Sequence, residues 1–141
     1  MNSQHQLFVY GSLRKGFEHP IFKYVSDYFH FVSPGKIKGI LYDLGEYPAA
    51  LPTEGESYIK GELYAIKEPT EFSYAIAQLD DYEGINPEEG SSLYRRELAS
   101  IYTDQGITTA WVYWYNGEIG TEPIIESGDM LQYLKEKYQL K

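Results

Sequence analysis

The sequence of 141 residues contains no cysteine, so disulfide bonds and thiol catalysis are excluded, while the redox compartment is left open. Basic residues are few: 12 Lys and Arg stand against 21 Asp and Glu, which gives a formal net charge of −9. The tight basic pairs are Arg14-Lys15 and Arg95-Arg96. Two pairs are too few for a stripe that follows a phosphate backbone, so nucleic acid is excluded as a partner, although one pair could receive a carboxylate.

Long apolar runs are also missing, as are the patterns of common metal and hydrolase sites. Residues 1–6 lack a basic region followed by an apolar one, so we expect no signal peptide or membrane span, and a soluble cytoplasmic protein. The three histidines show no paired spacing with acidic residues, which argues against a metal site. Ser12 does not stand in a Gly-x-Ser-x-Gly elbow, and no histidine and acid follow it in triad order, which argues against a serine hydrolase.

Aromatic residues, by contrast, are abundant: they make up 16% of the sequence, and the chain has 15 tyrosines. Hydrophobic residues account for 43%, which excludes a disordered chain and, at this length, predicts a single domain over residues 1–141. So many hydroxyl-tipped rings predict a core or a cavity that can contain a polar pocket. For any one tyrosine, an ordinary place in a strand is the competing interpretation.

An apolar run of strand-forming residues at 7–10 stops at Gly11 and Ser12. The backbone N–H groups of Gly11, Ser12 and Leu13 can form a small concavity for a carboxylate, because glycine permits unusual dihedral angles and removes a side chain. The alternative is a tight turn that only leads the chain out of a strand. The spacing is not that of a phosphate loop, which ends in Gly-Lys-Ser/Thr, so a nucleotide site is disfavoured.

The rest of the chain predicts a small, closed or strongly coiled sheet with three helices. Glycines inside two strands, Gly39 and Gly61, are typical of bends or close backbone approaches. Thr70 is the predicted N-cap and Gly84 the stop of the second helix, and Asp129 helps the positive end of the last one. The predicted strands are 7–10, 37–44, 58–66, 93–102 and 107–115, with a hairpin turn at 104–106. The predicted helices cover 20–29, about 12 residues from 70 onward, and a segment that begins at 127–129. A Pro- and Gly-rich connection lies between 44 and 58.

One carboxylate falls on the apolar face of the second predicted helix. At about 100° per residue, Glu83 lies within about 20° of the first apolar position, whereas Asp80 lies near the edge of the apolar stripe and Asp81 faces solvent. A carboxylate in apolar surroundings is costly when ionised, which raises its pKa and suits it to proton exchange near neutrality. The alternative is that Glu83 caps its own helix end or pairs with Arg95 or Arg96.

Six short motifs follow one another along the chain. They are Val9–Arg14, Tyr47-Pro48, Gly61–Tyr64, Leu79–Gly84, Tyr94-Arg95 and Ser127–Asp129. In this order they resemble the motifs of the γ-glutamylcyclotransferase-like family, and look closest to its small γ-glutamylamine cyclotransferase branch. The resemblance covers nearly the whole chain. It implies an α+β fold, a small, mostly antiparallel β-barrel with flanking helices and a cavity at its mouth.

The resemblance also implies a reaction. Family members release 5-oxoproline from a γ-glutamyl group without a metal, nucleotide or flavin, and the glutamate that corresponds to Glu83 is the acid/base. The implied partner is therefore a small-molecule substrate with a γ-glutamyl group. The other implied site residues are the loop that holds the substrate's α-carboxylate, Tyr10, Gly11, Ser12 and Leu13, and residues that border the site, Tyr94, Arg95 and Tyr115.

Several points stay open at this stage. Strand alternation sends Arg95 and Arg96 to opposite sides, and we choose Arg95 for the inward position because it follows Tyr94 directly. Met130 stands where an aromatic residue often follows the Ser-Gly-Asp motif, a change that we expect to affect packing only. A non-catalytic binding module for a small carboxylated or γ-glutamyl metabolite is the alternative function, and a structural or partner-binding domain is a third. The leaving amine and the oligomeric state are not specified.

Overall fold

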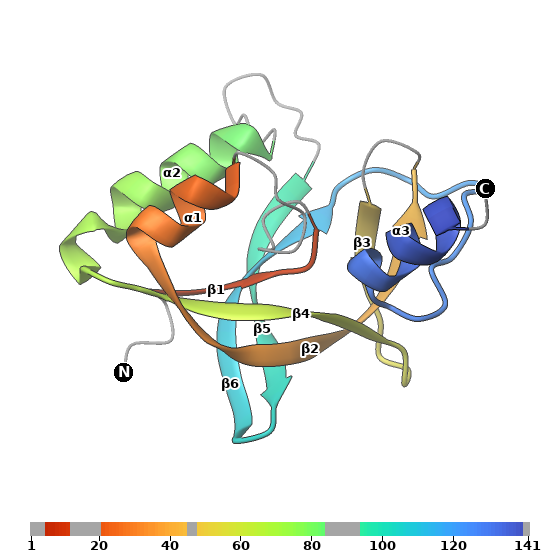
Figure 1. The fold of residues 1–141 in the computed structure, drawn as a ribbon, viewed down its shortest axis with the longest axis horizontal. Coiled ribbons are helices and arrows are strands. Elements are labelled where there is room, and N and C mark those ends of the chain that lie inside the picture. The colour runs from red at the N-terminus through yellow and green to blue at the C-terminus, as the bar shows by residue number, and fades with distance from the viewer. Residues whose placement is uncertain (1–4, 12–20, 45–47, 84–93, 140–141) are drawn as a thin grey trace.

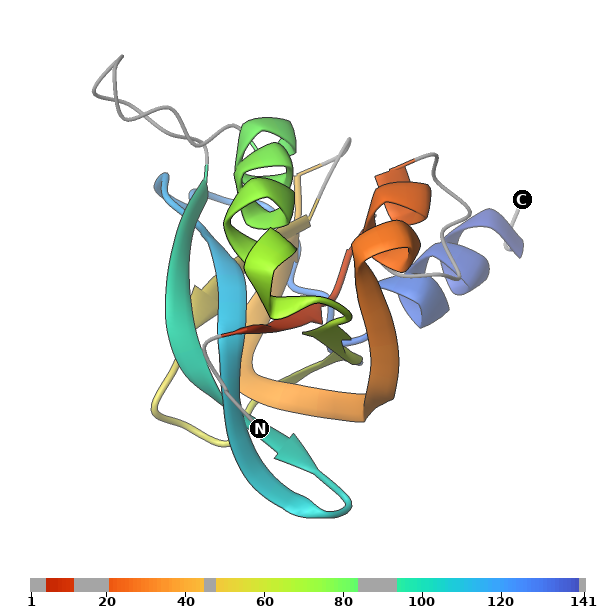
Figure 2. The same cartoon turned by 90° about the vertical axis from the view of Figure 1, so that its left-hand side faces the viewer.

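The computed structural model describes residues 5–11, 21–44, 48–83 and 94–139. Its centre is a barrel closed by five strands, with a sixth strand attached at one edge (Figures 1 and 2). The strand order is β3-β2-β4-β1-β6-β5, and a further pairing between β2 and β5 closes the barrel. The strands are β1 (Gln6–Val9), β2 (Phe29–Asp43), β3 (Pro48–Pro52), β4 (Tyr58–Ile66), β5 (Tyr94–Thr103) and β6 (Gly106–Tyr115).

Among the strand pairs of the described residues, all are antiparallel except one. β1 runs parallel to β6, and Leu7 lies opposite Trp111 in that pair. The expected small, mostly antiparallel barrel with flanking helices is therefore confirmed.

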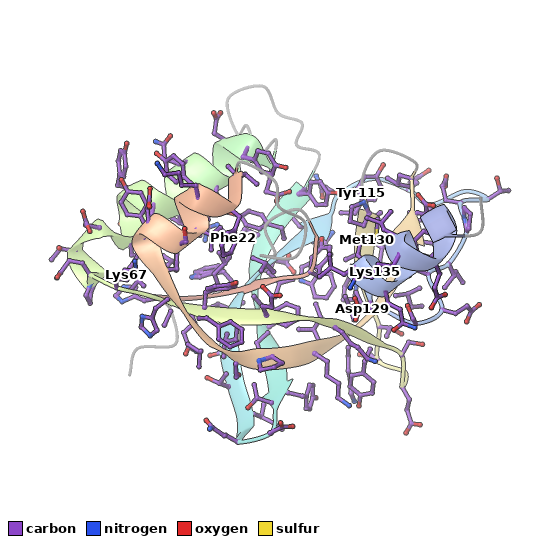
Figure 3. All side chains as sticks on the ribbon, in the orientation of Figure 1. Phe22, Lys67, Tyr115, Asp129, Met130 and Lys135 are labelled. Carbon is purple, nitrogen blue, oxygen red and sulfur yellow. The ribbon has the colours of Figure 1, made fainter. Side chains whose placement is uncertain are left out.

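Three helices flank the barrel. α1 (Ile21–Tyr28) and α2 (Phe72–Tyr82) lie together over one side of it, and α3 (Met130–Gln139) lies at the other end, beside β3 (Figure 1). Met130, at the start of α3, is buried in the barrel core (Figure 3). Within the described ranges, no helix is both long and apolar enough to cross a membrane.

The central strand β1 separates two hydrophobic cores. Leu7 and Val9 pack with α1 and α2 in the first core, whereas Phe8 and Tyr10 point into the barrel interior, the second core. This alternation follows from the two-residue period of a strand. Because β1 is buried on both faces, every residue from Gln6 to Tyr10 is less than 9% exposed, and the strand leads directly from the barrel centre to the segment that contains Gly11.

The glycines inside the predicted strands are required by close packing. A Cβ atom on Gly61 would lie 2.2 Å from the Val9 carbonyl oxygen and 2.6 Å from the Phe8 ring. A Cβ atom on Gly39 would lie 2.7 Å from Cδ1 of Ile59. All three distances are below those of real contacts, so the expectation of a close approach at these two positions is confirmed.

Several expected boundaries were wrong. The predicted strand at 37–44 begins at Phe29, which had been assigned to the preceding helix, because β2 pairs along β4 from that residue onward. Thr70 is not a helix N-cap: it lies in a 3₁₀ turn, Pro69–Glu71, and Glu71 stands at the cap position of α2. Gly84 lies outside the described residues. Asp129 does cap α3, since its Oδ1 accepts a hydrogen bond of 3.2 Å from the Gln132 N–H.

The largest omission was β3. The Pro- and Gly-rich connection between 44 and 58 contains this strand, which pairs with β2 from Gly39 to Asp43. Its proline ends, Pro48 and Pro52, are compatible with a strand at the edge of a sheet, where a missing N–H disrupts no ladder on the open side. The predicted hairpin, in contrast, is confirmed, with an unbroken register from Tyr94 opposite Tyr115 to the turn.

Candidate active site

The end of β1 lies against the start of β3 and the end of β6. The Tyr10 hydroxyl donates a hydrogen bond to the backbone carbonyl of Tyr113 in β6. A Cβ atom on Gly11 would lie 3.3 Å from Cγ of Pro48, the first residue of β3, which is tight for a side chain. Burial raises the pKa of Tyr10 well above its ordinary value, and Tyr94 and Glu83 raise it further. Tyr10 is therefore a neutral hydrogen-bond donor across the ordinary pH range.

Glu83 follows the last turn of α2. Its backbone N–H donates a hydrogen bond of 2.9 Å to the Leu79 carbonyl, and its side chain is only partly exposed. Burial raises the pKa of the carboxyl from 4.5 to about 8, and the charge of Asp80 adds to the rise. The carboxyl also raises the pKa of Tyr10 and of Tyr113, so it lies within electrostatic range of both hydroxyls. Its surroundings agree with the helical spacing, which directs Glu83 toward the packed face of α2.

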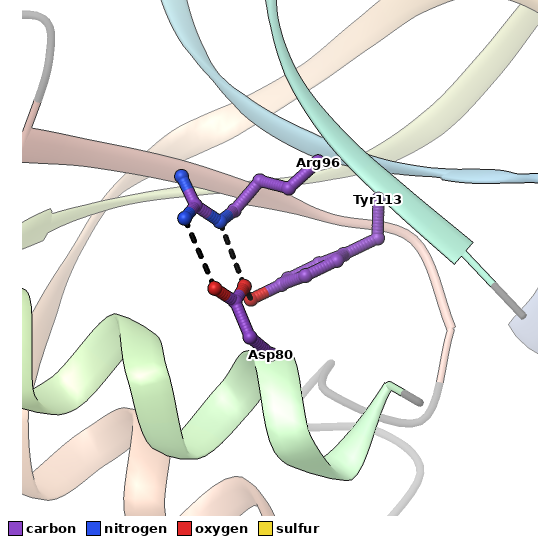
Figure 4. A network of polar contacts seen from close by, with 3 residues as sticks. All are labelled: Asp80, Arg96 and Tyr113. Atoms are coloured by element: carbon purple, nitrogen blue, oxygen red, sulfur yellow. Dashed lines mark hydrogen bonds and ion pairs between the residues drawn. The ribbon is translucent and has the colours of Figure 1, made fainter. Parts of the chain in front are cut away.

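A network of charged and polar groups lies beside Glu83 (Figure 4). The Arg96 guanidinium binds Asp80 in a forked pair, with Nε 2.7 Å from Oδ1 and an Nη 3.0 Å from Oδ2. The Tyr113 hydroxyl donates to the same Oδ1 at 2.8 Å. The guanidinium carbon also lies 4.4 Å from the centre of the Trp111 ring. These contacts join α2 to β5 and β6.

The network shifts the pKa of its own members. Burial lowers the pKa of Arg96, but the ion pair with Asp80 more than compensates, so the net shift is upward. Burial raises the pKa of Tyr113, Asp80 and Glu83 raise it further, and Arg96 opposes them. At neutral pH the network therefore consists of a guanidinium cation and a neutral phenol, both bound to the Asp80 carboxylate.

Arg96, and not the expected Arg95, is the arginine that joins the network beside Glu83. The Nε of Arg95 lies 3.1 Å from the Glu97 carboxylate, and its Nη1 donates to the Tyr115 carbonyl at 3.1 Å, with the side chain 36% exposed. Arg96, on the opposite face of β5, is the residue that reaches α2. The same alternation that separates the two arginines places Arg96 on the face of buried Tyr94, and this signal in the sequence could have identified Arg96.

Tyr94 and Tyr115 stand opposite each other at the open end of the hairpin. Their ring centres are 5.9 Å apart in an edge-to-face arrangement. The Tyr94 hydroxyl donates to the Pro48 carbonyl at 2.5 Å, so it supports the residue that faces Gly11. Tyr115 is partly exposed and packs against the first core (Figure 3).

The structure thus gathers most of the expected site residues at one end of the barrel. Tyr94 and Glu83 both raise the pKa of Tyr10, and Gly11 and Tyr115 adjoin this group through Pro48 and Tyr94. Ser12 and Leu13 lie outside the described residues. Sequence reasoning missed Tyr113 and placed Asp80 only at the edge of the helix face, although that edge is the position from which it meets β5 and β6. No group of three or more potential metal ligands occurs among the residues for which coordinates are described.

Comparisons with known proteins place the chain in a family. Residues 7–132 match the family described as gamma-glutamyl cyclotransferase, AIG2-like. A relative from Vibrio cholerae, named provisionally as a gamma-glutamylcyclotransferase, is 37% identical over 130 residues, which cover 92% of this chain and 97% of the relative.

Two solved structures share the fold. YkqA from Bacillus subtilis matches with a TM-score of 0.72 at 27% identity, over 99% of this chain and 43% of that one. The solution structure of ytfP from Escherichia coli matches with a TM-score of 0.60 at 33% identity, over 89% of this chain and 96% of that one. With the family match over most of its length, the chain belongs to the gamma-glutamyl cyclotransferase, AIG2-like family.

Proposed function

We propose that this protein is a γ-glutamyl cyclotransferase that releases 5-oxoproline and a free amine from a γ-glutamyl amine, peptide or conjugate, with Glu83 as the acid/base. The observation that carries the proposal is the state of the Glu83 carboxyl, whose pKa is raised to about 8 at the end of α2. A group that titrates near the operating pH is suited both to accept and to return a proton. The membership of the chain in this family supports the same reaction.

The chemistry requires one proton acceptor that later becomes a donor. In a γ-glutamyl amide the α-amine must attack its own γ-carbonyl carbon, but at neutral pH it is an ammonium group without a free electron pair. The Glu83 carboxylate removes one proton, and the amine then forms the new C–N bond of the ring. When the tetrahedral centre collapses, the original amide C–N bond breaks, and Glu83 returns its proton to the departing amine. The ring nitrogen loses a second proton to become the lactam N–H, and this proton passes to the same amine, which leaves as an ammonium ion.

A bound substrate must also be folded toward ring closure. We assign this task to the backbone N–H groups of Gly11, Ser12 and Leu13, which would hold the α-carboxylate. Fixing one end of a flexible chain holds the α-amine near the γ-carbonyl. The rotational entropy is then lost on binding and not in the reaction step, so the step is faster. The contact between Gly11 and Pro48 supports this assignment, because it fixes the start of the loop against β3. The nucleophile and the carbonyl belong to one molecule, so the reaction as written uses no cofactor.

Three tyrosines are proposed to border the substrate. Tyr10 and Tyr94 are buried with their hydroxyls bonded to backbone carbonyls, so they shape the wall next to Glu83. Tyr115, at the end of β6, is partly exposed and stands where the barrel opens. We expect the leaving amine to lie toward this open end.

The test is a screen of γ-glutamyl amines and γ-glutamyl peptides for release of 5-oxoproline, with Glu83→Gln as the informative variant. Glutamine keeps the size and hydrogen-bonding shape of the side chain but cannot take up a proton. Asp81→Asn is the matched control, since it removes a carboxylate from the same helix at an exposed position. We expect release by the wild-type protein and by Asp81→Asn, and a loss of at least about 100-fold in Glu83→Gln.

Two results would contradict the proposal. Equal turnover by Glu83→Gln would show that this carboxyl does not transfer the proton. If no compound is turned over but several bind with equal affinity to the wild-type protein and to Glu83→Gln, the protein is a binding module instead.

A further inference from the structure

Asp80 is the acceptor that two different strands share. It receives both nitrogens of the Arg96 fork from β5 and the Tyr113 hydroxyl from β6, and all three bonds are 3.0 Å or shorter. The side chains of Asp80 and Arg96 are only 20% and 21% exposed, so water screens the pair weakly. Removal of either partner would therefore leave a poorly solvated charge.

The position of Asp80 relative to Glu83 gives the ion pair a second effect. The two carboxyls are three residues apart on one helix, and residues at this spacing are neighbours on the helix surface. Glu83 and Arg96 both act on the Tyr113 hydroxyl, one raising and one lowering its pKa, so both charges lie within range of the same oxygen. An Arg96 without its carboxylate partner would be a cation near Glu83, and a nearby cation favours the ionised form of a carboxyl and weakens it as a base.

We propose that Asp80 is a positioning residue for Glu83: it binds Arg96 and the Tyr113 hydroxyl in one network, so that no unpaired cation faces the acid/base group. The proposal rests on the proposed function insofar as Glu83 is the acid/base. It assigns a task to three residues to which the proposed function gives none, and it explains why a second carboxylate is placed one helical turn before the first.

Glu83 is surrounded by a defined set of titratable and charged groups. The groups on its own helix are Asp80, which raises its pKa, and the exposed Asp81 and Tyr82. From the packed strands, Glu83 acts on the hydroxyls of Tyr10, at the end of β1, and Tyr113, in β6, and Arg96 from β5 acts on the same Tyr113 hydroxyl. Among the described residues, Arg96 is the cation that acts on this hydroxyl, and it is bound to Asp80.

The test measures the ionisation of Glu83 directly, without turnover. The protein is labelled with ¹³C at the glutamate carboxyl carbons, and the Glu83 signal is identified by its absence in Glu83→Gln. We expect Asp80→Asn to lower the pKa of Glu83 by at least about one unit, because it removes a like charge and frees Arg96. Arg96→Gln leaves the Asp80 carboxylate without its cation and should raise the pKa of Glu83. The double variant should titrate between the two single variants.

The same variants are then assayed for 5-oxoproline release as a function of pH. The substrate amine ionises in the same way with every variant, so a shift between the pH profiles of two variants reflects a change in the ionisation of the protein. In Asp80→Asn the rise of kcat/KM should begin at lower pH, with the ionised fraction of Glu83 at pH 6 about tenfold higher for a one-unit shift. Asp81→Asn serves as the control and should leave both the profile and the titration in place.

Opposite shifts in Asp80→Asn and Arg96→Gln support the proposal. A lower rate or stability with an unmoved titration overturns it, because the network would then be only structural. If Asp80→Asn fails to fold, an unmoved Glu83 titration in Arg96→Gln overturns it equally. The outcomes also separate the two proposals: shifted titrations without any turnover contradict the proposed function alone, whereas a loss of turnover in Glu83→Gln with unshifted titrations contradicts only the role of Asp80.

Discussion

Replacing Glu83 with glutamine should make the protein more stable at alkaline pH while it abolishes catalysis. The carboxyl has a pKa of about 8 in the folded protein and 4.5 without the influence of the fold. Between these values the unfolded chain has lost its proton and the folded chain has kept it. The free energy of unfolding of the wild-type protein therefore falls as pH rises through this window, and it levels off above pH 8.

The size of the effect follows from the same shift. Each unit corresponds to about 1.4 kcal/mol, so the full window is worth about 5 kcal/mol. Because the side chain is partly exposed, solvent reduces this cost, and we treat about 5 kcal/mol as the upper limit and about 2 kcal/mol as the smallest effect consistent with the argument. Glu83→Gln has no carboxyl to ionise at this position. The difference in free energy of unfolding between Glu83→Gln and the wild type should therefore be larger at pH 8.5 than at pH 4.5, by about 2 to 5 kcal/mol in favour of the variant.

The measurement is urea unfolding followed by the fluorescence of Trp111 and Trp114, which both lie in β6. Wild type, Glu83→Gln and the control Asp81→Asn are compared at intervals between pH 4.5 and 9. The control removes a carboxylate from an exposed position of the same helix, so its difference from the wild type should stay constant. A stability difference for Glu83→Gln that does not change with pH, or that decreases toward alkaline pH, would refute the reasoning.

Three further changes test other parts of the structure. Gly61→Ala places a methyl group 2.2 Å from the Val9 carbonyl oxygen, so we expect a loss of at least about 2 kcal/mol or a failure to fold, and an unchanged melting temperature would contradict the packing described. Tyr133→Phe removes a 2.6 Å hydrogen bond to the buried Asp43 carboxylate and should cost about 1 to 3 kcal/mol in chemical denaturation. Asp129→Ala removes the cap of α3 and should cost about 1 kcal/mol by the same assay; no loss would mean that the cap bond contributes nothing.

The parts of the fold that follow local rules could be predicted from the sequence. The hairpin of β5 and β6 has alternating strand residues on both sides of a short turn, and its register agrees with that pattern. β3 could not be found in this way, because Pro48 and Pro52 oppose a strand locally and the strand forms only where β2 offers a partner. Phe29 continues the helical spacing of α1, yet it belongs to β2 because the ladder with β4 outweighs that preference.

The candidate site divides in a similar way. The packed surroundings of Glu83 could be predicted from its helical position alone, and its raised pKa agrees with that position, whereas its role as the acid/base stays a prediction. Arg95 was chosen over Arg96 on sequence adjacency, whereas the face of a strand depends on alternate residues. The role of Asp80 depends on contacts with Arg96 and Tyr113, which come from strands that follow it by 16 and 33 residues, and no local pattern contains such distances.

The pairing of β1 has a consequence for the time at which the protein acquires its site during synthesis. β1 has no partner nearby in the sequence: Gln6 lies opposite Ala65, Leu7 lies opposite Trp111, and the Tyr10 hydroxyl bonds to a carbonyl 103 residues later. Until β6 has left the ribosome, the apolar residues of β1 lack their final neighbours and are open to aggregation. We therefore expect the barrel and its site to form together, late, in one event, and nascent chains that end before residue 111 to depend on chaperones for solubility.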